Sequence, residues 1–78
     1  SPILADVQSA LAACGEAERT RLEAAAHSYL RTGSISASAQ ELFCHRNTLA
    51  NRLRRFAEIT GVDPTVPEQA ARLVVGWA

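Results

Sequence analysis

The fold is decided by residues 36–55, which read SASAQELFCHRNTLANRLRR. Ser36 is a residue type that caps helices well, and the residues after it, 37–43, predict a short helix. The helical pattern breaks at residues 44–45 and resumes as a longer helix over about 46–60. Two helices joined by so short a break predict a helix-turn-helix.

Each of these two helices has an apolar face. In the second helix apolar residues recur every three to four positions, which is the period of a helix that packs against a core. Gly61 is expected to end that helix. The residues expected to face inward are Ala39, Leu42 and Phe43 in the first helix and Leu49, Leu53, Phe56 and Thr60 in the second.

Helices are also predicted on both sides of this pair. One ends before Gly15, a second covers about 16–31 and stops at Gly33, and a last one begins near Val66–Pro67. The expected inward residues are Ile3, Leu4, Val7 and Leu11, then Leu22, Ala25, Ala26, Tyr29 and Leu30, and finally Ala70, Leu73, Val74 and Trp77. The whole chain is therefore predicted to be one all-α domain, a small bundle of about five helices with a helix-turn-helix at roughly 36–60.

Length and composition exclude several classes of protein. A chain of 78 residues forms one domain at most, with little room for a large enzyme pocket. Eight Arg balance eight acids, which excludes a uniformly basic nucleic-acid coat. Because the chain lacks a long apolar run and has only two cysteines, we expect a soluble cytoplasmic protein. The sequence shows no catalytic constellation, so we expect no enzyme activity. Since it starts at Ser1 without Met, we expect a fragment of a longer protein.

The arginines are not spread evenly along this neutral chain. Residues 46–55 contain four Arg and no acid, whereas residues 1–30 contain four acids and two Arg. With Leu49, Leu53 and Phe56 facing the core, a helical wheel places the polar residues of this segment on the opposite face. That face has the residue types that bind DNA.

The chemistry of these side chains suggests how they would divide the contacts. Arg can donate two hydrogen bonds to guanine, Asn can pair in the same bidentate manner with adenine, and the Thr methyl can contact that of thymine. The residues expected to meet base edges are Arg46, Asn47, Thr48 and Asn51. Phosphates are expected to be held by Arg52, Arg54 and Arg55, and by the helix-start amides that follow Ser36 and His45. The expected partner is double-stranded DNA, with no cofactor, metal or catalytic residue.

The same stretch resembles a known family. The motif Leu-Phe-x-His-Arg-Asn-Thr-Leu at 42–49, followed by Arg-Leu-Arg-Arg at 52–55 and Glu-Ile-Thr-Gly at 58–61, is similar to the C-terminal helix-turn-helix domain of PucR-type bacterial transcription regulators. The similarity covers roughly residues 20–75. It implies sequence-specific DNA binding by the tail of a longer regulator, with a recognition helix at about 46–60. Useful specificity would need two copies on paired half-sites, which leaves a homodimer of the full-length protein open.

Three positions depart from that family's pattern. Cys44 stands where a branched aliphatic residue is usual, and the turn tolerates it as a small hydrophobe. Ala50 and Asn51 replace the basic residue and the tyrosine that are common there. We expect this loss of a charge and an aromatic ring to change the affinity or the preferred site.

Other interpretations of the same residues remain open. Cys14, His27, Cys44 and His45 make up one conceivable zinc set, but they lack the closely spaced pairs of known zinc sites. His45 fits a helix cap better than a base reader, and Cys44 fits burial in the turn better than a redox switch. The alternative function is a helical protein-interaction or dimerisation domain that does not bind DNA.

Overall fold

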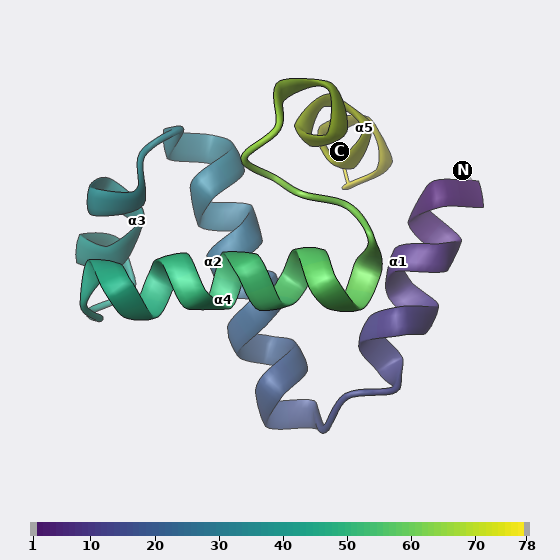
Figure 1. Cartoon of the computed structure of the whole chain (residues 1–78), viewed down its shortest axis with the longest axis horizontal. Coiled ribbons are helices and arrows are strands. Elements are labelled where there is room, and N and C mark those ends of the chain that lie inside the picture. Colours follow the sequence, from purple (N-terminus) through teal and green to yellow (C-terminus); the bar gives the residue numbers. More distant parts are fainter. Residues whose placement is uncertain (1, 78) are drawn as a thin grey trace.

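The computed structural model describes residues 2–77, with side chains from Asp6 to Gly76, and this part of the chain forms five helices and no strand (Figure 1). The predicted all-α bundle is therefore confirmed. The predicted core positions Ile3, Leu4 and Trp77 lie outside the described side chains. The helices are α1 (Pro2–Ala12), α2 (Glu16–Thr32), α3 (Ile35–Glu41), α4 (Arg46–Thr60) and α5 (Pro67–Trp77).

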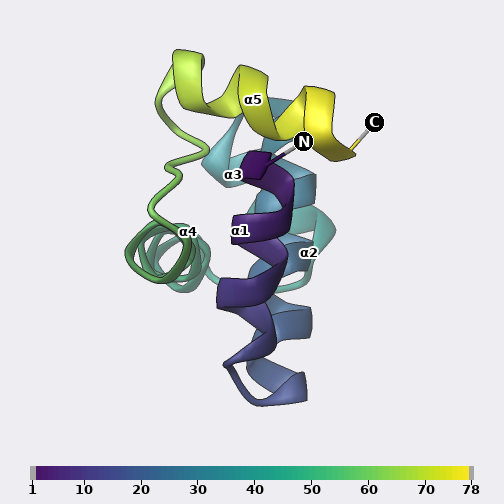
Figure 2. The same cartoon turned by 90° about the vertical axis from the view of Figure 1, so that its right-hand side faces the viewer.

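Helix α4 is the centre of the arrangement. Figure 1 shows it lying across α2, with α3 beside its N-terminal end and α1 near its C-terminal end. Helix α5 packs on α1 and, seen from the side in Figure 2, runs across one end of the molecule. The N-terminal end of α4 therefore lies on the opposite side of the molecule from α1.

The buried side chains form two clusters that α4 connects. The first cluster joins α1, α2, α5 and the loop after α4, and it takes Phe56 from α4. The second cluster lies between α2, α3 and α4 and takes Leu49 and Leu53 from α4. The first cluster consists of Val7, Leu11, Leu22, Ala26, Phe56, Val62 and Leu73, and the second of Ala25, Ala39, Leu49 and Leu53, with Tyr29 and Leu30 half-buried against them.

The ends of α4 are where the sequence predicts them. Gly61 ends the helix with a left-handed backbone, φ 74°, and its N–H donates to the Ala57 carbonyl at 2.8 Å. Gly33 ends α2 in the same way with φ 67°. The hydroxyl of Thr60, which is half-buried, donates to the Phe56 carbonyl at 2.7 Å.

The start of α3 differs from the prediction. The cap is Ser34, not Ser36: Ser34 has extended backbone, and its hydroxyl accepts the N–H of Ala37 at 3.1 Å. The earlier start makes Ile35 the first helical residue, and Ile35 packs against the second cluster. That apolar contact favours a cap at Ser34 and leaves Ser36 exposed in the first turn.

The end of α3 also differs. The helix stops at Glu41, and Phe43, which was expected to face inward, is 94% exposed. Phe43 has a left-handed backbone, with φ 55°, which turns the chain so that the N–H of Cys44 donates to the Ala39 carbonyl at 2.9 Å. As a result Cys44, instead of Phe43, packs against the second cluster, as expected for burial of this thiol in the turn.

Helix α5 buries a narrower face than its sequence predicts. Leu73 is buried in the first cluster and Ala70 is half-buried, but Val74, expected in the same stripe, is 48% exposed. Helix α5 contacts mainly α1, so only part of its apolar face is covered. The prediction for Val74 was therefore wrong.

Candidate nucleic-acid interface

Helix α3 is held against α2 by polar contacts as well as by the second cluster. The Glu41 carboxylate accepts hydrogen bonds from the Ser28 hydroxyl and from the Arg31 guanidinium. These bonds, the one from Ser28 first, lower the pKa of Glu41 below its ordinary value. The hydroxyls of Thr32 and Ser38 are hydrogen-bonded at 2.7 Å. Because α3 is fixed in this way, it provides a firm support for the start of α4.

The first turn of α4 is capped by a side chain. Nδ1 of His45 accepts the N–H of Asn47 at 3.0 Å, so the cap role predicted for His45 is confirmed. A ring that accepts through Nδ1 carries its proton on Nε2, which can donate outward. The first amides of a helix have no intrahelical acceptor and attract anions. The end of α4 that faces away from α1 thus presents hydrogen-bond donors.

Three of the four predicted base-reading residues are exposed on α4. Arg46, Asn47 and Asn51 are exposed, whereas Thr48 is half-buried and faces α2. The side-chain oxygen Oδ1 of Asn51 accepts a hydrogen bond from Nη1 of Arg54 at 2.7 Å. The side-chain NH₂ of Asn51 is left as a donor. The structure therefore leaves Arg46, Asn47 and Asn51 exposed in the first half of α4, whereas Thr48 lies at the margin toward α2.

The predicted phosphate-binding arginines differ in how they are held. Arg54 is exposed and Arg52 is half-buried. Arg55 is bound within the molecule, because its Nε lies 3.1 Å from Glu18 and its Nη1 lies 3.7 Å from Glu58. The hydrogen bond that Arg55 donates to the Glu18 carboxylate is the main reason why the pKa of Arg55 is raised. A phosphate would have to compete with Glu18 for this guanidinium.

One further arginine joins this surface from another helix. A hollow between α2 and α4 is lined by Arg21 and Leu22 of α2 together with Thr48 and Arg52 of α4. Sequence reasoning passed over Arg21, because residues 1–30 are acidic overall. Only its helical position, one turn beyond Glu18 on the same side of α2, could have indicated that it lies beside α4.

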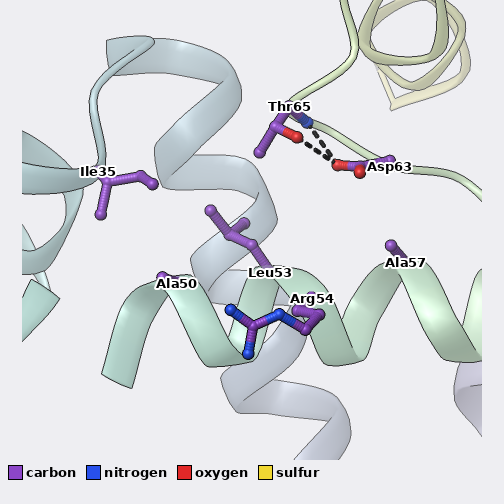
Figure 3. A pocket seen from close by; sticks show the side chains of 7 residues that line it. All are labelled: Ile35, Ala50, Leu53, Arg54, Ala57, Asp63 and Thr65. Atoms are coloured by element: carbon purple, nitrogen blue, oxygen red, sulfur yellow. Dashed lines mark hydrogen bonds between the residues drawn. The ribbon is translucent and has the colours of Figure 1, made fainter. Parts of the chain in front are cut away.

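A groove runs along the other side of α4 (Figure 3). The Asp63 carboxylate accepts both the N–H and the hydroxyl of Thr65, at 2.8 and 2.7 Å, so it stabilises the loop after α4. Figure 3 shows the Arg54 side chain lying along α4 toward Ala50 and away from Asp63. The lining is Ile35, Ala50, Leu53, Arg54, Ala57, Asp63 and Thr65.

Neither a metal site nor a membrane-spanning helix is found in the described part of the chain. There, no three His, Cys, Asp or Glu side chains come close enough together to hold a metal ion. Cys14 and Cys44 are free thiols, both half-buried. No helix in residues 2–77 has the length and apolar character needed to cross a membrane.

Comparison with known proteins agrees with this geometry. The chain is 50% identical over 38 residues to uncharacterized proteins of Mycobacterium bovis and of two strains of Mycobacterium tuberculosis. The match covers 49% of this chain but only 9% of the length of those relatives. No solved structure gives a significant match. The model of the PucR C-terminal helix-turn-helix domain matches residues 22–77, which include α3, α4 and the turn between them. The chain therefore belongs to the family of PucR C-terminal helix-turn-helix domains.

Proposed function

We propose that this chain is the DNA-binding module of a transcription regulator, with α4 as the recognition helix in the major groove. In this proposal Arg46, Asn47 and Asn51 read base edges. Thr48, at the margin of the polar face, would contact bases only through its methyl group. The family supports the general function, because a helix-turn-helix places its second helix in this way.

One observation carries the proposal. The N-terminal turn of α4 is capped by His45, is braced by α3 and presents the exposed side chains of Arg46 and Asn47 on the side away from α1. A helix held at its inner face and exposed at its N-terminal turn fits the geometry in which that turn enters a major groove.

The phosphate contacts in this proposal come from arginines and from the starts of α3 and α4. Arg52 and Arg54 are available on α4, and Arg21 of α2 adds a charge beside them. Ser36, exposed in the first turn of α3, and the amides that follow His45 are further candidates. Arg55 takes part only when a phosphate displaces Glu18. Three available arginines predict a log–log salt slope of roughly −3.

The proposal extends to the protein from which such a module comes. The matched segment covers 9% of the length of the curated relatives, which is consistent with a domain of a longer regulator. A single module makes a small interface with DNA, so specific binding would rest on two copies at paired half-sites. No catalytic step or cofactor is part of the proposal.

The proposal is tested by NMR titration of the isotope-labelled chain with a random-sequence duplex at low salt. Lone modules bind such DNA weakly, with Kd around 10⁻⁴ to 10⁻⁶ M at physiological salt, and shift changes detect binding of that strength. We expect shifts in residues 34–55 that added salt reverses. If the shifts are absent, or are confined to α1 or α5, DNA binding through α4 is wrong.

A protein-interaction domain is the second candidate. The observation that favours it is the exposure of Val74 and Val75, at 48% and 79%, near a groove that Tyr29 and Leu30 help to line. Exposed apolar side chains beside a groove are typical of surfaces that bind other proteins. In the same NMR experiment, shifts in α5 that depend on the protein concentration and not on DNA would favour this function.

A further inference from the structure

Phe43 is the most exposed large hydrophobic residue among the described side chains. It is 94% exposed, and its ring contributes nothing to either buried cluster. An isolated exposed apolar residue needs no explanation by itself. Phe43 needs one because of its backbone and its position.

The backbone of Phe43 is in the left-handed region, with φ 55°. This conformation is unfavourable for a bulky L-residue and free of strain for glycine. The same region is used at Gly33 and Gly61, where the chain also leaves a helix, and both of those positions have glycine. The turn between α3 and α4 thus has a phenylalanine at a position where glycine would give the same bend with less strain. A strained residue without a packing role points to a role outside the fold.

The surroundings of Phe43 indicate what its ring would meet. Phe43 lies in the turn two residues before the His45 cap, and the exposed Arg46 and Asn47 follow that cap in the sequence. The nearest carboxylate in the sequence, that of Glu41, is already bound by Ser28 and Arg31. The turn that carries the ring therefore leads directly into the end of α4 that has exposed cations and hydrogen-bond donors.

A protein partner would be expected to cover several apolar residues together. The other exposed large hydrophobics among the described side chains are Val66, Val74 and Val75, all in α5 or just before it. Figure 1 shows α5 well away from the turn between α3 and α4. One exposed aromatic ring, in a turn that leads into a helix start with basic and polar side chains, fits a DNA duplex better, because the charged strands of the duplex expose small apolar patches in the groove.

We propose that Phe43 is a DNA-contacting residue whose ring packs on apolar surface of the duplex, either a thymine methyl group or a deoxyribose. The proposal rests on the proposed function and adds to it a contact outside α4. It also explains why the turn has an aromatic side chain where glycine would fit. Such a contact removes apolar surface from water and is independent of salt.

The first test compares Phe43→Gly with the unaltered chain. The variant should have an unchanged or higher Tm, because glycine adopts this backbone without strain. Its affinity for DNA should fall by about three- to tenfold, as expected for losing one apolar contact. The log–log salt slope should stay the same, because no charge is removed. The variant Phe43→Asn, which also tolerates a left-handed backbone, should show the same loss, and Val75→Ala, at an exposed valine of α5, should show none.

The second test identifies the source of the apolar surface. Deoxyuridine in place of thymidine removes only the methyl group. If the unaltered chain loses affinity on such a duplex and Phe43→Gly does not, the ring contacts a methyl group. If neither is affected while Phe43→Gly still binds more weakly, the ring contacts a deoxyribose.

Two results would overturn the proposal, and they can be told apart. If the unaltered chain binds DNA and Phe43→Gly binds it equally well, the proposal for Phe43 fails while the proposed function stands. If the unaltered chain shows no DNA-dependent shifts at low salt, both fail together.

Discussion

The two halves of α4 are held in different ways. In the first half, residues 46–52, Leu49 packs into the second cluster and His45 caps the end, while most of the polar side chains are exposed. In the second half, residues 53–60, Arg55 is paired with Glu18 of α2 and with Glu58. Beyond them Thr60 is hydrogen-bonded to Val62 of the following loop. In the proposed function the first half binds DNA and the second half anchors α4 in the domain, so a substitution in each should have a different effect.

The largest expected effect comes from breaking the anchored half. Phe56 is fully buried in the first cluster, and Phe56→Ala should lower the free energy of unfolding by about 3–5 kcal/mol. Because a domain of this size has little stability to spare, the variant should be largely unfolded at 25 °C and lose DNA binding with its fold. Urea unfolding followed by circular dichroism measures this loss. The matched exposed variant Arg54→Ala should change stability by no more than about 0.5 kcal/mol.

A smaller effect is expected from substitutions in the binding half. Asn47→Ala should leave the fold intact and weaken binding to the preferred site about tenfold, with little change on random DNA, because a base-reading contact is lost. The preferred site would first be found by selection from a random duplex library. Arg52→Ala is the control, since loss of a phosphate contact should weaken both kinds of binding alike and reduce the salt slope by about 1. Equal losses for both variants on both DNAs would mean that the division of roles is wrong.

Releasing Arg55 from Glu18 tests whether Arg55, in the second half of α4, can also bind DNA. Glu18→Gln removes the partner that holds Arg55 at 3.1 Å, so we expect DNA affinity to rise about two- to fivefold and the salt slope to become steeper by about 1. Fluorescence anisotropy at several salt concentrations measures both. In the double variant Glu18→Gln, Arg55→Ala the gain should disappear. A gain that persists there would show that Glu18 acts by general repulsion of DNA and not through Arg55.

The smallest effect is expected at Glu41, which holds α3 against α2 next to the binding half of α4. The pKa of Glu41 is lowered from 4.5, so its contacts with Ser28 and Arg31 stabilise the fold above that pH. This contribution is lost as the pH falls through the lowered pKa of the folded state. Glu41→Gln should therefore lower Tm slightly at pH 7. In strong acid the Tm values of the variant and the unaltered chain should become equal. A constant difference in Tm at every pH would exclude the carboxylate charge as the cause.

Sequence reasoning worked well where the signal is local. Both ends of α4 follow from residues next to them, because His45 can cap the first turn and Gly61 can take the left-handed backbone that ends the last. The helix-turn-helix pair was predictable for the same reason, since Leu49, Leu53 and Phe56 repeat at helical spacing. The matched family model confirms that the motif at 42–49 was identified correctly.

The errors arose where two local signals compete or where the partner is distant in the sequence. Ser34 and Ser36 are both good caps, and the choice depends on where Ile35 packs. Phe43 reads as a core residue because it is apolar, and only the left-handed turn shows that its ring points to solvent. The contact between Arg55 and Glu18 joins residues 37 positions apart and depends on how α2 crosses α4, which periodicity cannot show.

Because α4 contributes to both buried clusters, it determines how the domain unfolds. Phe56 is committed to one cluster, and Leu49 and Leu53 to the other. Neither cluster can come apart without loosening the helix that the other one needs, so the two should unfold as a single cooperative unit. Amide protons in the middle of α4 should then exchange with solvent only when the whole domain unfolds, whereas those of α5, which rests mainly on α1, can exchange through local fraying. The helix proposed to enter the groove is in that sense the most persistent part of the molecule.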